Sequence, residues 1–149
     1  MNLPNMITIF RLLLTTYIVW LILSESYFLG FLFFVISGIS DGLDGFIAKK
    51  LNQKTLLGSY LDPIADKLLV AAVILILTSK GVIKDWDTIP ALIILLREIT
   101  VSGLREYLAG IKISIPVSTI AKAKTFLQLA SLGLLILSES NLNLLFIIY

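Results

Sequence analysis

Apolar stretches about as long as a lipid bilayer is thick recur along this sequence. They cover residues 6–24, 27–48, 57–78, 89–107 and 119–137. Roughly 20 helical residues are needed to cross the hydrocarbon core of a membrane. Only 15% of the 149 residues are charged, whereas about 25% are charged in soluble domains. The sequence therefore predicts an integral membrane protein.

The pattern inside these stretches favours helices. Backbone polar groups within a bilayer must be hydrogen-bonded inside the protein, and the sequence lacks the alternation that is typical of membrane strands. A last apolar segment, residues 141–149, begins another span but is too short to cross. We therefore expect an all-α polytopic bundle of about six transmembrane helices, with the last one short or truncated.

Positively charged residues concentrate in alternate connections. The connection after the second stretch holds Lys49, Lys50 and Lys54, and the region after the fourth holds Lys112 and Lys122. Cytoplasmic loops of membrane proteins are enriched in lysine and arginine. We therefore expect the N-terminus and the ends of the even-numbered spans to face the cytoplasm. We expect no cleaved signal peptide, because the N-terminus lacks a basic region.

Missing residue types limit the chemistry that the chain can perform. It contains no cysteine and no histidine. Thiolate metal sites and a cysteine nucleophile are therefore excluded, and so is the commonest general base. The net charge of +2 gives no reason to expect a nucleic-acid partner. Any catalysis must use carboxylates, hydroxyl groups, lysines or bound metal ions.

Acidic and small residues interrupt the second and third apolar stretches in a helical pattern. At about 100° per residue, each group falls on one stripe of its helix. The stripe on the second span consists of Asp41, Asp44, Gly45 and Ala48. The stripe on the third span consists of Gly58, Asp62 and Asp66. Two antiparallel helices joined by a short loop can bring these stripes face to face.

Four converging carboxylates predict a metal site. Without cations they would repel one another and lose their hydration. Two divalent ions remove that conflict, and a set of hard oxygen ligands favours Mg²⁺ or Mn²⁺. A single aspartate could equally pair with Lys67 or Arg97 in a structural role, but four on two stripes favour the metal. The glycines would let a nucleotide or a phosphate approach the backbone closely.

The segment DGLDGFIAKKLNQKTLLGSYLDPIAD, residues 41–66, resembles the signature of the CDP-alcohol phosphotransferases. That signature is D-x-x-D-G-x-x-A-R, a spacer, and then G-x-x-x-D-x-x-x-D. The matching positions are Asp41, Asp44, Gly45, Ala48, Gly58, Asp62 and Asp66. One position departs, because the family's arginine after Ala48 is Lys49 here. Lysine keeps the positive charge but lacks the two-pronged donor geometry of arginine.

Three further segments extend the resemblance over nearly the whole chain. They are NLPNMITIFR near the N-terminus, REITVSGLRE at 97–106 and KAKTFLQ at 122–128. They are similar to bacterial family members that transfer a phosphatidyl group from CDP-diacylglycerol to sn-glycerol 3-phosphate and release CMP. The resemblance implies one transmembrane catalytic domain over residues 1–149, in the bacterial cytoplasmic membrane. It also implies a homodimer surrounded by membrane lipids, with its active site facing the cytoplasm.

The resemblance also implies residue roles. Asp41, Asp44 and Asp62 hold two divalent ions, and Asp66 shares the second ion. Asp66 is also the expected general base, because the chain has no histidine to take the proton from the acceptor hydroxyl. The expected CDP-binding residues are Gly45, Ala48, Lys49 and Gly58, together with Asn5 and Thr8.

The acceptor carries a dianionic phosphate, so its pocket should be basic. The expected phosphate-binding residues are Arg105, Lys122, Lys124 and Arg11. On the alternative interpretation, the lysines only anchor helix ends at the membrane surface. Arg97 lies deeper in the fourth span, and Glu98 faces about 100° away from it, so these two need not form a pair.

Three other functions fit parts of this pattern. A cardiolipin synthase of the same fold would use phosphatidylglycerol as acceptor and would have less use for Arg105, Lys122 and Lys124. An intramembrane prenyltransferase also uses aspartate-bound Mg²⁺, but with different aspartate spacing. A cation-coupled transporter would more often show an internal repeat with broken helices.

Overall fold

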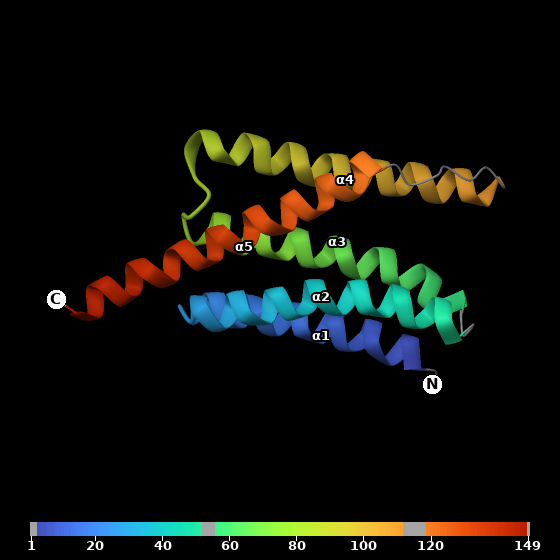
Figure 1. Cartoon of the computed structure of the whole chain (residues 1–149). Coiled ribbons are helices and arrows are strands. Elements are labelled where there is room, and N and C mark those ends of the chain that lie inside the picture. The colour runs from blue at the N-terminus through green and yellow to red at the C-terminus, as the bar shows by residue number, and fades with distance from the viewer. Residues whose placement is uncertain (1–2, 52–55, 112–118, 149) are drawn as a thin grey trace.

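The structure is a computed structural model (Figure 1). It describes the backbone of residues 3–51, 56–111 and 119–148. Within these ranges, the side chains are described except at residues 3–5, 7, 41–51, 56–63, 119 and 141–148.

The described residues form five long helices and one short 3₁₀ helix. In chain order they are α1 (Leu3–Leu23), α2 (Tyr27–Leu51), α3 (Leu56–Ser79), η1 (Asp85–Asp87), α4 (Thr88–Gly110) and α5 (Thr119–Ile148). No strand occurs among these residues, so the all-α prediction is confirmed. The first four apolar stretches correspond to α1 to α4, with ends that differ by up to three residues.

The prediction of a separate sixth segment is wrong. Residues 141–148 continue α5, which runs without interruption to Ile148. No glycine or proline occurs after Gly133 to stop the helix. The Ser138 and Ser140 hydroxyls donate to the carbonyl oxygens of Leu135 and Leu137, at 2.8 and 2.7 Å. These serines therefore satisfy their polar groups on the helix itself, and do not end it.

Consecutive helices run in opposite directions (Figure 1). As a result, the end of α2, the start of α3 and the end of α4 lie toward the end of the molecule that carries the N-terminus. α1 is the main packing partner of both α2 and α3, and α5 crosses α2. The helix ends that carry the predicted metal and CDP-binding residues therefore lie at one end of the bundle.

The hydrophobic core lies between α1, α2, α3 and α5. Its fully buried side chains include Ile18 and Ile22 of α1, Val73 and Leu77 of α3, and Ile136 of α5. Among the described side chains of α4, only Ala91 is buried, while Ile94 and Leu95 pack against the core and stay partly exposed. Because α4 packs so lightly, space remains open between α3, α4 and α5.

One segment of the described residues is both long and apolar enough to cross a membrane, Ile120–Ser140 of α5. Thr8–Leu23 and Tyr27–Ser40 are apolar helical segments of shorter length. This criterion covers only the part of the chain whose residues are described.

α2 and α5 meet at Gly133, where an added Cβ atom would already be in van der Waals contact with α2. A Cβ atom added there would lie 3.4 Å from Phe31 Cε2 and 3.6 Å from Phe34 Cε1. The same crossing continues at Gly30, where an added Cβ would lie 3.9 Å from Ile136 Cγ2. A larger residue at 133 would therefore push the two helices apart.

We expect Gly133→Leu to lower the free energy of unfolding by about 1–3 kcal/mol, because the new side chain collides with the two phenylalanine rings. Gly103→Leu on α4 is the matched control. No described heavy atom lies within 4 Å of a Cβ placed at residue 103, and leucine favours helix over glycine. Thermal unfolding of the purified variants measures both effects. Equal losses of stability would contradict the close crossing of α2 and α5.

Candidate active site

The predicted metal ligands lie on two helix ends. Asp41 and Asp44 are on the last three turns of α2, and Asp62 and Asp66 are on the first three turns of α3. Only the Asp66 side chain belongs to the described residues. Among the described side chains, no three potential metal ligands of the histidine, cysteine, aspartate or glutamate type form a cluster. The four-aspartate cage therefore stays a prediction from the sequence.

The predicted CDP-binding residues also stay predictions from the sequence, and only one of them has a described side chain. Their backbone is helical, but the side-chain environments of Asn5, Gly45, Ala48, Lys49 and Gly58 lie outside the described residues. Thr8 is the exception, since its side chain is described and buried. It lies on α1, one turn before Arg11.

Arg11 and Asp66 form an ion pair between α1 and α3. Arg11 Nη1 donates to Asp66 Oδ1 at 2.7 Å, and the two side chains are 2% and 48% exposed. The arginine is therefore buried, while the aspartate keeps half of its surface accessible. The sequence predicted that Arg11 binds the acceptor phosphate, whereas in the structure it contacts the predicted general base. A charge buried this deeply requires a partner.

Asp66 opens into a cavity of about 330 Å³, called here the Asp66 cavity. All five long helices contribute to its wall. Its polar and charged lining residues are Arg11, Ser37, Asp66, Lys67, Glu98, Arg105, Thr125 and Gln128. The cavity therefore joins the predicted base to side chains of both charge signs.

A second cavity, of about 370 Å³, lies between α3, α4 and α5 and is called here the basic cavity. It shares Lys67, Glu98, Arg105 and Thr125 with the Asp66 cavity, so the two are neighbours. Its basic lining residues are Lys67, Arg97, Arg105 and Lys124, and its acidic ones are Glu98 and Glu106. Four positive charges against two negative ones suit the binding of an anion.

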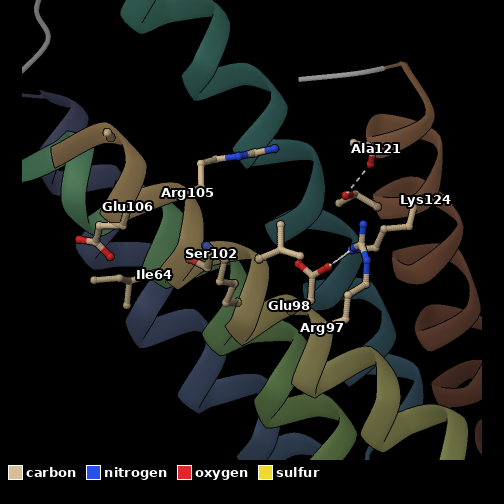
Figure 2. Close-up of a pocket in the computed structure, with 12 residues that line it drawn as sticks. Ile64, Arg97, Glu98, Ser102, Arg105, Glu106, Ala121 and Lys124 are labelled. Atoms are coloured by element: carbon tan, nitrogen blue, oxygen red, sulfur yellow. Dashed lines mark hydrogen bonds and ion pairs between the residues drawn. The ribbon is translucent and has the colours of Figure 1, made fainter. Parts of the chain in front are cut away.

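Glu98 holds two of these cations together. Figure 2 shows Arg97 of α4 and Lys124 of α5 turned toward its carboxylate. Arg97 Nη1 donates to Glu98 Oε1 at 3.0 Å, and Lys124 Nζ contacts the same oxygen. The pair of Arg97 and Glu98 that the sequence analysis did not require is therefore present, because the long arginine side chain bends back to its neighbour. Glu98 also connects α4 to α5.

The structure brings together only part of the predicted phosphate-binding set. Arg105 and Lys124 line the basic cavity, and Arg11 lines the Asp66 cavity. Lys122 is exposed and lines neither of them, because at about 100° per residue it faces away from Lys124.

Several residues that line these cavities were not predicted as site residues, among them Lys67, Arg97 and Glu98. Lys67 and Arg97 were considered only as structural partners of an aspartate, and Glu98 was assigned no role. The available signal was that each is an ionisable residue within an apolar span, which marks a functional position more often than a structural one.

Comparisons with known proteins agree with the signature in the sequence. The model of the family described as CDP-alcohol phosphatidyltransferase matches residues 1–149. Three curated relatives carry the name "CDP-diacylglycerol--glycerol-3-phosphate 3-phosphatidyltransferase". The Rickettsia bellii protein is 48% identical, over 98% of this chain and 81% of its own length. The Haemophilus influenzae protein is 42% identical, over 94% and 78% of the two chains.

The Escherichia coli K12 protein is 39% identical, over 91% of this chain and 76% of its own length. These matches confirm the resemblance stated from residues 41–66 and from the three flanking segments. The chain therefore belongs to the CDP-alcohol phosphatidyltransferase family.

Proposed function

We propose that this enzyme transfers a phosphatidyl group from CDP-diacylglycerol to the primary hydroxyl of sn-glycerol 3-phosphate, giving phosphatidylglycerophosphate and CMP. The observation that carries the proposal is the basic cavity beside Asp66, which pairs an anion-binding wall with a carboxylate. The names of the three relatives support the same donor and acceptor.

The proposal places the enzyme in the bacterial cytoplasmic membrane as a multi-pass protein, with residues 1–149 acting as one catalytic domain. Large apolar side chains that point outward support this placement. Leu13 of α1 and Leu75 of α3 are each 65% exposed, and Phe126 of α5 is 72% exposed. Soluble monomers rarely expose extended apolar surface. A homodimer, with the active site facing the cytoplasm, is part of the proposal.

A pair of divalent ions fits the donors that the chain offers. Asp41, Asp44, Asp62 and Asp66 would hold them, and carboxylate oxygens are the ligands that Mg²⁺ and Mn²⁺ prefer. The Asp66 side chain is half exposed, so it retains surface for further ligands beside its contact with Arg11. When bound, Mg²⁺ or Mn²⁺ supplies the positive charge that neutralises the pyrophosphate and the departing CMP.

The chain's own residues handle the proton and the acceptor. Asp66 takes the proton of the primary hydroxyl, whose oxygen attacks the β-phosphorus of CDP-diacylglycerol. The bond from that phosphorus to the oxygen of the α-phosphate breaks, and CMP leaves. Arg11 orients the Asp66 carboxylate through the 2.7 Å hydrogen bond to Oδ1. Gly45, Ala48, Lys49, Gly58, Asn5 and Thr8 are the proposed CDP-binding residues.

The acceptor phosphate is assigned to the basic cavity. Arg105 and Lys124 are the proposed ligands, and Lys67 and Arg97 add positive charge to the same wall. Glu98 fixes the positions of Arg97 and Lys124 before the phosphate arrives. A cardiolipin synthase, whose acceptor offers a neutral hydroxyl group, would have little use for so many cations in this place.

CMP release from CDP-diacylglycerol tests the proposed reaction. With Mg²⁺ and glycerol 3-phosphate we expect turnover, and we expect none in EDTA. Asp66→Asn should reduce the rate by a factor of about 10²–10⁴, the usual contribution of a general base. Asp85→Asn is the matched control, since Asp85 is exposed in η1, directly before the start of α4. Figure 1 shows that α4 starts at the end of the bundle opposite the start of α3, which carries Asp66. Turnover with phosphatidylglycerol alone, or full activity in EDTA, would contradict the proposal.

Lys124→Gln and Lys122→Gln test the assignment of the acceptor site. Only the first of these lysines lines the basic cavity. Loss of a charged hydrogen bond should raise the KM for glycerol 3-phosphate about tenfold to a hundredfold in Lys124→Gln. The KM for CDP-diacylglycerol should change little in either variant. Equal effects of the two substitutions on the acceptor KM would show that the phosphate binds elsewhere.

A further inference from the structure

Two residues that line the Asp66 cavity each carry a buried polar atom that has no hydrogen-bond partner among the described residues. These atoms are Ser37 Oγ of α2 and Gln128 Oε1 of α5. The two side chains are 0% and 8% exposed. Buried polar atoms in proteins are almost always hydrogen-bonded, and leaving them unpaired costs free energy. What enters the cavity must therefore satisfy them.

Ser37 and Gln128 lie near the contact between α2 and α5. Ser37 and Gln128 are adjacent in sequence to Gly38 and Leu129, where α2 and α5 touch, and a Cβ added to Gly38 would lie 4.0 Å from Leu129 Cδ1. Both residues also line the cavity that contains Asp66.

Gln128 also marks where the polar cavity ends. On its other side lies an apolar groove of about 330 Å³, whose lining includes Ile83, Ile94 and Leu132. The cations of the Asp66 cavity lie on α1, α3 and α4, whereas Ser37 and Gln128 add no charge. The part of a ligand that reaches this wall should therefore be neutral and polar.

A hydroxyl group has the matching hydrogen-bonding capacity. It donates one hydrogen bond and accepts others. A ligand hydroxyl can donate to Gln128 Oε1 and accept from the Ser37 hydroxyl, so that both unpaired atoms gain a hydrogen-bond partner. Of the groups on glycerol 3-phosphate, the primary hydroxyl is used in the reaction and the phosphate requires cations. The secondary hydroxyl is the group that remains.

We propose that Ser37 and Gln128 form a hydroxyl-binding subsite that recognises the secondary hydroxyl of the glycerol 3-phosphate acceptor. This inference rests on the proposed function and makes these two residues determinants of acceptor specificity. A site built to hydrogen-bond a substrate hydroxyl discriminates strongly against an analogue that lacks it, because its own buried groups are then left unpaired.

The test compares two acceptors, glycerol 3-phosphate and 3-hydroxypropyl phosphate. Both have a phosphate and a primary hydroxyl, and only the first has a secondary hydroxyl. We expect the unmodified enzyme to favour glycerol 3-phosphate in kcat/KM by about tenfold or more. In Ser37→Ala and Gln128→Leu, kcat/KM for glycerol 3-phosphate should fall about tenfold, while the value for the analogue should stay the same or rise.

Ser131→Ala is the matched control. Ser131 is exposed on α5, and its hydroxyl donates to the carbonyl oxygen of Leu127 at 2.8 Å, so the preference between acceptors should persist. Thermal unfolding without substrate separates folding from recognition. Ser37→Ala should unfold at the same or a higher temperature, because it removes a buried hydroxyl that has no partner in the protein.

Each outcome has a distinct meaning. Equal use of both acceptors by the unmodified enzyme, or equal losses for both in the variants, would overturn the subsite and assign ordered water to these two atoms. CMP release with another acceptor, but with neither glycerol 3-phosphate nor 3-hydroxypropyl phosphate, would overturn the proposed function itself. Selective loss of glycerol 3-phosphate turnover in both variants would support the subsite.

Discussion

The ion pair between Arg11 and Asp66 is the interaction on which the site depends. A guanidinium that is 2% exposed needs a charged partner in contact, so the pairing of Arg11 with Asp66 favours the register in which α1 and α3 associate. That register places Asp66 at the wall of a cavity to which all five long helices contribute. The position of the candidate base is therefore determined by folding, because the arginine that fixes it lies 55 residues away in the sequence.

The second part of the site is the basic cavity, which stays open because α4 packs lightly. Because α4 buries little of its own surface in the core, the space between α3, α4 and α5 stays open and collects charged side chains. Glu98 joins Arg97 and Lys124 across that space and so ties α4 to α5. An acceptor phosphate in this cavity would lie beside Lys67 and Arg105, which also border the cavity of Asp66.

The helices were largely predictable from the sequence, since apolar runs of membrane-spanning length indicate where each one begins and ends. The exception was the C-terminal segment, which was predicted to begin another span, whereas Ser138 and Ser140 bond to their own helix and α5 continues to Ile148. The family and the aspartate signature were also predictable, because their spacing is local. The partner of Arg11 was not predictable, because the sequence of one helix shows where a charge lies but not which residue of another helix faces it. Ser37 and Gln128 were missed for the same reason.

In the proposed reaction, the acceptor hydroxyl attacks the phosphorus of the phosphatidyl group, with the acceptor held between Asp66 and the basic cavity. Mass spectrometry of the products formed from CDP-diacylglycerol and glycerol 3-phosphate tests this directly. We expect phosphatidylglycerophosphate and CMP in equal amounts. Phosphatidate together with a CMP-linked glycerol phosphate would mean attack on the other phosphorus and would contradict it.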